Sequence, residues 1–90
     1  MSEHEKHNEN IEVMVVVSGQ SERLKINLHQ TLEQLVHEAL QKSGNQGQAP
    51  SEWELRTEDG HLLDQSLTVA AAGLHDGATL FLSPKAGAGG

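Results

Sequence analysis

The sequence predicts a two-layer α+β domain in which a single helix packs across one face of a mixed β-sheet. Two observations lead to this prediction. Apolar residues alternate at period two in short runs toward both ends of the chain, and between those runs they recur once at the spacing of a helix. Turn residues that include glycine separate the segments. One helix cannot bury both faces of a sheet, so it is expected to cover one of them.

The composition suits one small domain with an aliphatic core. The chain has 90 residues, of which 36% are hydrophobic, with one Trp, one Phe and no Tyr. Its formal net charge is −7, which offers no electrostatic footprint for nucleic acid or an anionic membrane. It contains no cysteine, which excludes disulfides, zinc–thiolate sites and thiol nucleophiles. We expect a monomer that binds neither nucleic acid nor membrane.

Nothing in the sequence is typical of a membrane anchor or an export signal. The longest uninterrupted apolar run is Val13–Val17, whereas a membrane-spanning helix needs about 20 residues. The first ten residues carry more acid than base and no apolar segment, unlike a signal peptide. We therefore expect a cytoplasmic protein.

The first two strands are expected to form a hairpin. The β-branched run Ile11–Ser18 places alternate apolar residues on one face, and the alternation resumes over Arg23–Leu28. The intervening Gly19–Ser21 has the composition of a turn. Two such runs with a short glycine-containing connection predict a β-hairpin. The residues expected to face the core are Ile11, Val13, Val15, Val17, Leu24, Ile26 and Leu28.

The apolar period then changes to that of an amphipathic helix over Thr31–Ser43. Thr31 and Gln34 have the spacing of a capping box at its start. Lys42 suits the negative end of the helix dipole, and Gly44 can adopt the left-handed conformation that ends a helix. The apolar stripe consists of Leu32, Leu35, Val36, Ala39 and Leu40.

The second half of the chain predicts further short strands. Residues 45–51 are a polar loop, after which Trp53–Thr57 alternates as a strand and Leu62-Leu63 suggests a brief fourth strand. Ser66–Leu74 leaves room for one short turn of helix. The last strand, Thr79–Leu82, points Leu80 and Leu82 to one face and Phe81 to the other. The expected domain spans residues 11–82, between a disordered acidic tail at 1–10 and a flexible tail at 83–90.

The stretch from Leu63 to Leu82 resembles the second half of ubiquitin and of ubiquitin-like domains. The Thr68-Val69 pair, Leu74 and the run Thr79–Leu82 fall into the places of that pattern without a gap. The order of elements over residues 11–82 is similar to the β-grasp arrangement of the family. The resemblance therefore implies a ubiquitin-like β-grasp fold, a mixed sheet of four to five strands with one helix across one face.

Ubiquitin-like modifiers end in a Gly-Gly dipeptide, and this sequence ends in Gly89-Gly90. The resemblance implies that an activating enzyme adenylates the Gly90 carboxylate with ATP, and that the modifier then forms an isopeptide bond with target amines. Glycine has no side chain to obstruct entry into a narrow activating site. Together with Gly89 and Gly90, the residues expected to thread into that site are Lys85, Ala86, Gly87 and Ala88.

The retained Gly-Gly, in an otherwise divergent chain, resembles the ubiquitin-like proteins of bacterial ubiquitination-like operons. That resemblance implies an activating enzyme, a conjugating enzyme, a deconjugating metalloprotease and target proteins as partners. The apolar surface patch of ubiquitin is not reproduced, because its positions fall near Arg56 and at Ser83. Phe81 and Arg56 are instead the candidates for a partner surface.

We expect no catalytic residue, no bound cofactor and no metal in the chain itself. His4 and His7 could chelate a metal only from a helix, and no third ligand is evident. The carboxylates between Glu52 and Asp64 are more typical of a solvated or partner-facing surface than of a hydrolase site, because so small a domain offers little room for a pocket.

Two other functions remain open at this point. A sulfur carrier shares the fold, the Gly-Gly end and the adenylation step, and its C-terminus ends as a thiocarboxylate. A non-conjugated interaction module would bind partners through a sheet surface or an edge strand. The fate of the C-terminus distinguishes the three, since deletion of Gly89-Gly90 would leave only the interaction module unaffected.

Overall fold

The computed structural model describes residues 9–85 and contains one sheet with one α-helix across it. The strands are β1 (Asn10–Val17), β2 (Gln20–Asn27), β3 (Trp53–Thr57) and β4 (Thr79–Pro84). Helix α1 spans Leu32–Lys42 and a single turn of 3₁₀-helix, η2, spans Pro50–Glu52. The strand order is β2-β1-β4-β3, with β1 and β4 parallel and the outer pairs antiparallel.

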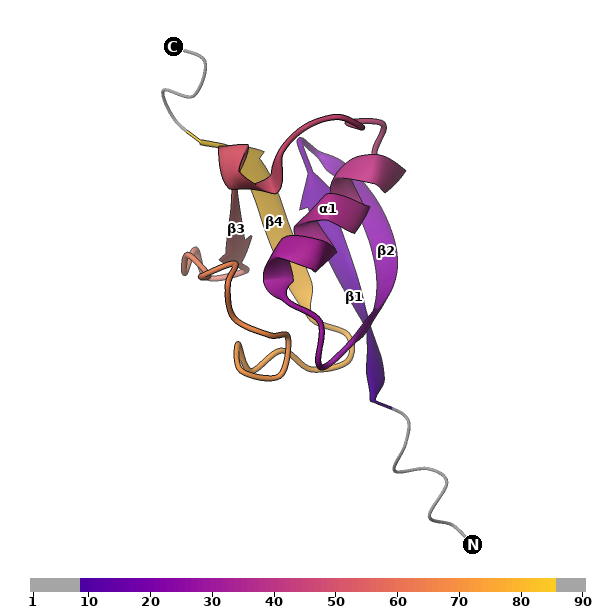
Figure 1. Ribbon diagram of the computed structural model, residues 1–90, viewed down its shortest axis with the longest axis vertical. Helices are drawn as coiled ribbons and strands as arrows, with labels where there is room; N and C mark the ends of the chain where they lie inside the picture. The colour runs from indigo at the N-terminus through magenta and orange to yellow at the C-terminus, as the bar shows by residue number, and fades with distance from the viewer. Residues whose placement is uncertain (1–8, 86–90) are drawn as a thin grey trace, which may run out of the picture.

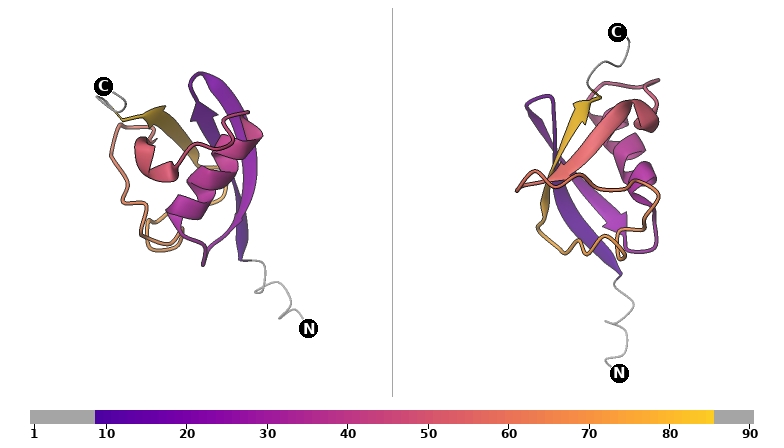
Figure 2. Two further views of the ribbon diagram at one scale, coloured as in Figure 1. Left: turned by 45° about the horizontal axis from the view of Figure 1, so that its top comes forward. Right: turned by 90° about the vertical axis from the view of Figure 1, so that its left-hand side faces the viewer.

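Helix α1 covers one face of this sheet and leaves the other open (Figures 1 and 2). The predicted α+β fold is thus confirmed, with four strands in the sheet. The outer elements reach slightly beyond the predicted boundaries of 11–82, because β1 begins at Asn10 and β4 ends at Pro84.

The core has the aliphatic character that the composition predicts. Alternate residues of all four strands face α1, and the five apolar residues of its stripe are fully buried against them. No polar or charged residue among those described is buried. The buried set is Val13, Val15, Val17, Leu24, Ile26, Leu32, Leu35, Val36, Ala39, Leu40, Trp53, Leu55, Val69, Leu80 and Leu82.

The start and the end of α1 confirm the prediction from its capping residues. The Thr31 hydroxyl accepts a hydrogen bond from the Gln34 backbone N–H at 3.2 Å, and the Gln34 side chain accepts one from the Thr31 N–H at 3.1 Å. After the C-cap Ser43, Gly44 has a φ of +85°. The boundaries of this helix follow from local chemistry alone.

The β1–β2 turn lies one residue earlier than predicted. The prediction of a turn at Gly19–Ser21 is wrong, since Val17 pairs with Gln20 and the loop is Ser18-Gly19. Both loop residues have positive φ, +50° at Ser18 and +85° at Gly19. A two-residue loop of this kind matches the twist of the strands better than a longer loop does. Because the loop is this short, Gln20 and Ser21 belong to β2.

Two predictions for the segment between β3 and β4 are corrected. Leu62-Leu63 does not form a strand, because only a single bridge joins Leu62 to Arg56. Ser66–Leu74 contains turns but no assigned helix, although the Ala72 N–H donates to the Thr68 carbonyl at 3.0 Å. Residues 61–65 run along β3 without extending the sheet, and Val69 is buried in the core.

Candidate partner-binding surface

The open face of the sheet presents an apolar centre to solvent. In register, Val16 of β1 lies beside Phe81 of β4, and Phe81 lies beside Arg56 of β3. Phe81 is 42% exposed, as its outward position in the alternation predicts. Val16 and the neighbouring Met14 are half-buried by their position within the sheet. The structure thus brings together the two residues that the sequence proposed for a partner surface, Phe81 and Arg56.

Arg56 is held in place at the border of this centre. Its Nη2 lies 2.8 Å from Oε1 of Glu54, and its Nη1 donates to the Gly60 carbonyl at 3.2 Å. Leu62, which is 50% exposed, forms a bridge with Arg56. An aromatic residue and an arginine beside aliphatic side chains are enriched in protein interfaces, so this face has the composition of a contact surface.

The sequence-based predictions did not identify Leu62 as a surface residue. It was expected to be part of a strand, in which one of two consecutive leucines would face the core. Outside the sheet, Leu63 packs against the core and Leu62 remains exposed. Only the path of the chain around β3 shows which of the two leucines is exposed, since two adjacent apolar residues do not define a periodic pattern.

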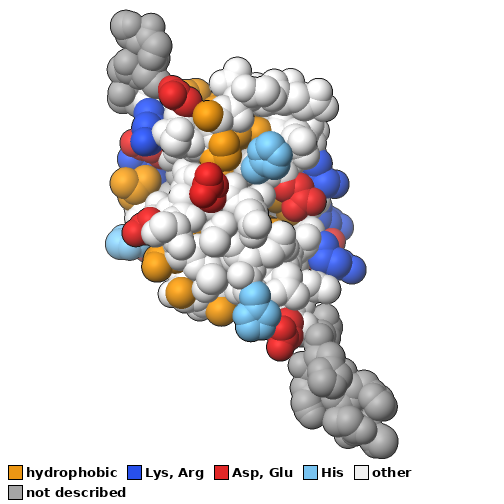
Figure 3. Space-filling view, in the orientation of Figure 1, with side chains coloured by type: hydrophobic (Ala, Val, Ile, Leu, Met, Phe, Trp, Pro, Cys, Tyr) orange, Lys and Arg blue, Asp and Glu red, His pale blue; other side chains and the backbone are white. Residues whose placement is uncertain are grey.

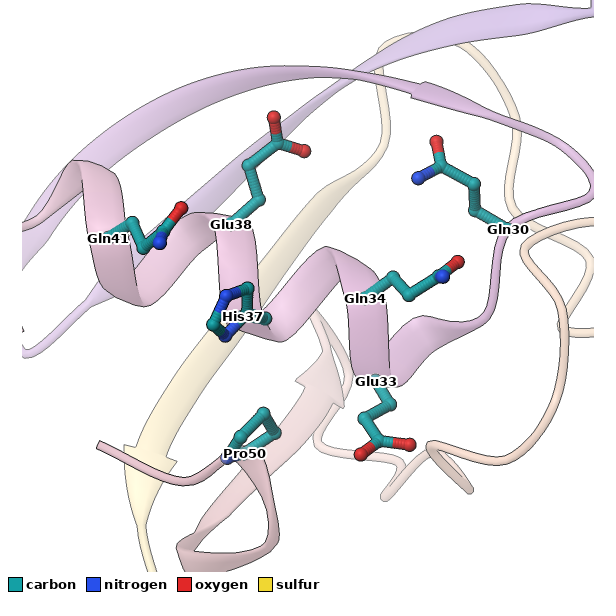
Figure 4. A pocket seen from close by; sticks show the side chains of 7 residues that line it. All are labelled: Gln30, Glu33, Gln34, His37, Glu38, Gln41 and Pro50. Carbon is teal, nitrogen blue, oxygen red and sulfur yellow. The ribbon is translucent and has the colours of Figure 1, made fainter. Parts of the chain in front are cut away.

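The outer face of α1 carries a shallow hollow of about 490 Å³ that is lined by polar side chains (Figure 4). The labelled side chains, five from α1 with Gln30 before it and Pro50 of η2, do not converge on a common point. Within residues 9–85, no group of three His, Asp or Glu residues could hold a metal ion. The lining residues are Gln30, Glu33, Gln34, His37, Glu38, Gln41 and Pro50.

Two aspartates have lowered pKa values for local reasons. The pKa of Asp59 is lowered mainly by a hydrogen bond from the Thr57 hydroxyl, and that of Asp64 by hydrogen bonds from the backbone N–H and the hydroxyl of Ser66. Both carboxylates stabilise turns next to β3. Hydrogen bonds to the charged form account for both shifts without a catalytic role.

The chain leaves the sheet at the far end of β4. The Lys85 backbone N–H donates to the Glu52 carbonyl at 2.9 Å, and the Lys85 side chain is exposed. The remaining residues proposed for threading and conjugation, Ala86, Gly87, Ala88, Gly89 and Gly90, lie outside the described residues. None of the described helices is long and apolar enough to cross a membrane.

Solved structures share this architecture. A protein of de novo design based on ubiquitin superposes with a TM-score of 0.76 at 18% identity, over 92% of this chain and 98% of that one. Ubiquitin of Caldiarchaeum subterraneum gives 0.70 at 16% identity, over 84% and 94% of the two chains. A chain from a structure described as "Molecular Mimicry of SUMO promotes DNA repair" gives 0.75 at 21%, over 88% and 96%. At such identities the likeness shows the fold alone, which is ubiquitin-like.

The sequence also has a relative of undefined function. An uncharacterised protein of Sinorhizobium fredii (strain NBRC 101917 / NGR234), y4jI, is 39% identical over 80 residues, which is 89% of this chain. This chain spans 62% of the length of that relative. Residues 6–90 match the family described as Protein of Unknown function (DUF2604), and the chain belongs to that family.

Proposed function

We propose that this chain is a ubiquitin-like protein modifier, joined to target amines through the carboxylate of Gly90. The observation that carries the proposal is the combination of a body that superposes on ubiquitin with a Gly89-Gly90 dipeptide shortly after β4. The fold alone serves many functions and a Gly-Gly dipeptide alone is common in linkers. Together they meet the two requirements of a modifier, a recognisable body and a reactive end without side chains.

The distance from the body to the reactive end fits this role. Residues 86–90 follow Lys85, whose N–H is bonded to Glu52. Five residues extend by at most about 17 Å, because an extended chain advances about 3.4 Å per residue. The Gly90 carboxylate could thus enter a narrow site of an activating enzyme while the folded body stays at its mouth.

The proposed reaction requires all catalytic groups to come from partners. The Gly90 carboxylate attacks the α-phosphorus of ATP and releases pyrophosphate, which leaves an acyl-adenylate. A cysteine thiolate of the activating enzyme displaces AMP to form a thioester, which passes to a conjugating enzyme. A target amine then attacks the thioester, an amide forms and the thiol is released. This chain has no cysteine and could not supply the thiol itself.

The open face of the sheet is the proposed contact surface for these partners. Phe81 offers an exposed aromatic ring, and Arg56 is oriented beside it by Glu54. A deconjugating metalloprotease and readers of the modifier would contact the same surface. The chain itself is proposed to bind no cofactor and to be non-enzymatic.

The test begins with the mass of the C-terminal peptide of the mature protein, which must end at Gly90. Tagged wild type and a variant without Gly90 are then expressed in the cells that carry the gene. The expected result is a ladder of higher-mass species, found with the wild type and absent with the deletion.

Other results would replace the proposal. A free protein whose mass increases by the exchange of one oxygen for sulfur would identify a sulfur carrier. An unchanged mass without conjugates, in cells that express the neighbouring genes, would leave a non-conjugated interaction module. The variant Phe81→Ala separates recognition from chemistry, because it leaves Gly90 intact and is expected to reduce the ladder.

A further inference from the structure

Two Asp-Gly dipeptides lie in turns at the ends of neighbouring strands. Asp59-Gly60 follows β3, and Asp76-Gly77 precedes β4. Both glycines have positive φ, +86° at Gly60 and +91° at Gly77, which glycine adopts more readily than other residues. Turn geometry accounts for both glycines, but an Asp-Gly dipeptide also has a chemistry of its own.

An aspartate followed by glycine can rearrange without a catalyst. The glycine nitrogen attacks the side-chain carboxyl carbon, a C–N bond forms, and the amide proton leaves with the carboxyl hydroxyl as water. Water then opens the resulting succinimide at either carbonyl, which restores aspartate or yields isoaspartate, whose main chain runs through the side-chain carbons. Glycine favours the attack because it has no side chain to hinder the approach. The reaction requires an amide N–H and a carboxyl group that are both released from other hydrogen bonds.

At Asp76-Gly77, both reacting groups are bonded to another strand. The Glu12 N–H of β1 donates to Oδ1 of Asp76, and the Gly77 N–H donates to the Glu12 carbonyl, each at 2.7 Å. A further bond, from the Met14 N–H to the Ala78 carbonyl at 2.9 Å, leads directly into the parallel pairing of β1 with β4. Release of both reacting groups therefore requires β1 and β4 to separate, which is a large opening of the sheet.

At Asp59-Gly60, both reacting groups are bonded within the turn itself. The Thr57 hydroxyl donates to the Asp59 carboxylate, and the Gly60 N–H donates to the Thr57 carbonyl at 2.9 Å. Residues 58–60 are exposed, and carboxylate and histidine side chains stand at the border of the molecule next to β3 (Figure 3). A movement of this turn alone frees the nitrogen and the carboxyl group, because exposed turns open locally at little cost in free energy.

The Thr57 hydroxyl is expected to slow the reaction without preventing it. Its hydrogen bond is the main reason why the pKa of Asp59 lies below its ordinary value. The bond thus favours the ionised carboxyl group, whereas the neutral form is the better electrophile for the glycine nitrogen. Removal of the hydroxyl should both free the carboxyl group and raise its neutral fraction.

The same turn holds Arg56 at the open face of the sheet. The Gly60 carbonyl accepts a hydrogen bond from Nη1 of Arg56 at 3.2 Å, and Nη2 is bonded to Glu54 at 2.8 Å. Isoaspartate at residue 59 adds one carbon to the main chain directly before Gly60. This addition displaces the Gly60 carbonyl from Arg56 and leaves its guanidinium with the bond to Glu54 alone.

We propose that Asp59 is a modification site, at which the folded protein forms isoaspartate and Arg56 loses its bond to the turn. Asp76 is protected by its connection to β1. The reaction releases one water and takes one up, so it needs no enzyme and no other reactant. It is independent of any reaction at the C-terminus. Aged molecules therefore differ from new ones at the open face of the sheet, beside Phe81.

The test incubates the full chain for weeks at neutral pH, both folded and in concentrated urea. Peptide mapping with electron-transfer fragmentation locates isoaspartate, and the NMR amide signals of Gly60 and Gly77 give the rates. In the folded protein, isoaspartate should form at Asp59 at least about tenfold faster than at Asp76. In urea, which separates β1 from β4, the two rates should become similar.

The effect on Arg56 is measured in the same samples. As isoaspartate accumulates at residue 59, nitrogen relaxation of Arg56 Nε should show greater mobility. Arg23 Nε, which lies 4.0 Å from a carboxylate oxygen of Glu12 on β1, is the control and should not change. Unchanged relaxation of Arg56 in molecules that carry isoaspartate would overturn this part of the proposal.

Two variants at residue 57 form a matched pair. Thr57→Val lacks the hydroxyl and should accelerate the reaction at Asp59 about fivefold, whereas Thr57→Ser keeps it and should react like the wild type. Asp59→Glu keeps the charge and should form no isoaspartate there, since glutamate would have to close a six-membered ring. Equal rates at Asp59 and Asp76 in the folded protein, or reaction at neither while urea permits both, would refute the local release of the turn.

Discussion

The two edges of the sheet differ in how their backbone groups are satisfied. At β3, a segment without strand structure covers the edge. The Thr57 N–H donates to the His61 carbonyl, the Leu63 N–H to the Leu55 carbonyl, and Gln65 Nε2 to the Trp53 carbonyl, at 2.9–3.0 Å. At β2, Gln30 bonds the N–H and the carbonyl of Asn27 at the end of the strand, but no described residue bonds the outward backbone groups of Ser21, Arg23 and Lys25. A four-stranded sheet of this size can thus be closed on one side and available for pairing on the other.

The lesson is that edge protection and core formation are separate properties of a strand. Both edge strands bury two large apolar residues in the common core, and in that respect they are equivalent. Bonds from the following segment run along the covered edge, whereas at β2 the described residues bond outward backbone groups only at Asn27.

The largest effect is expected from truncation in the core, and it should be similar for both edge strands. Leu24 of β2 and Leu55 of β3 are 1% and 0% exposed, so Leu24→Ala and Leu55→Ala should each lower the free energy of unfolding by about 2–5 kcal/mol. Urea denaturation measures both values. If only Leu55→Ala lowered the free energy of unfolding by this amount, β2 would contribute less to the core than β3, and the two edge strands would not be equivalent.

A smaller effect is expected from opening the covered edge. The Gln65 amide donates to the Trp53 carbonyl at 2.9 Å and to the Pro50 carbonyl at 3.2 Å. Gln65→Ala should lower the free energy of unfolding by about 1–3 kcal/mol, because both part-buried acceptors lose their donor. Gln48→Ala, in an exposed loop, is the control and should change it by at most about 0.5 kcal/mol. Equal effects of the two substitutions would show that Gln65 does not stabilise the covered edge.

Acid should loosen the covered edge and leave β2 unchanged. The pKa of Asp64 is held below its ordinary value of 3.8 by hydrogen bonds from Ser66, so its contribution is complete above pH 3.8. The contribution is lost as the pH falls through the lower folded-state pKa. Hydrogen exchange at the Ser66 and Leu63 amides should therefore accelerate in that range relative to the β1–β2 hairpin.

The variant Asp64→Ala provides the control for this pH dependence. Relative to the hairpin amides, it should show the faster exchange already at neutral pH and no further change on acidification, since the titrating group is gone. Acceleration of the hairpin amides in the same pH range would instead indicate global unfolding, and the local effect would be refuted.

The smallest effect on stability is expected at the open edge. Arg23 is largely exposed and 4.0 Å from Glu12, so Arg23→Thr/Lys25→Thr should change the free energy of unfolding by at most about 0.5 kcal/mol. The same variant should increase self-association in sedimentation equilibrium, because the charges that oppose edge pairing are removed. A strictly monomeric variant at high concentration would mean that the backbone geometry of β2, not its charge, prevents pairing.

Several features of this protein were predictable because they depend on nearby residues. The capping box of Thr31 and Gln34, the buried stripe of α1 and the outward position of Phe81 all follow from spacings within one element. The two-layer class follows from a single amphipathic helix in a chain whose other segments have apolar residues at alternate positions, as strands do. The reactive dipeptide Gly89-Gly90 was recognised only through a family resemblance, and its role remains a prediction.

The tertiary structure decided the features that join distant segments. The position of the hairpin loop at Ser18-Gly19 depends on which residues of β1 and β2 pair, and a shift of one residue would turn every side chain of β2 to the other face. The course of residues 61–65 along β3 depends on the Gln65–Trp53 hydrogen bond, twelve residues apart. Periodicity in a sequence reports which face of an element is apolar, because burial acts on each element separately. It does not report which edge is covered, because that depends on backbone hydrogen bonds whose donors and acceptors are the same in every residue.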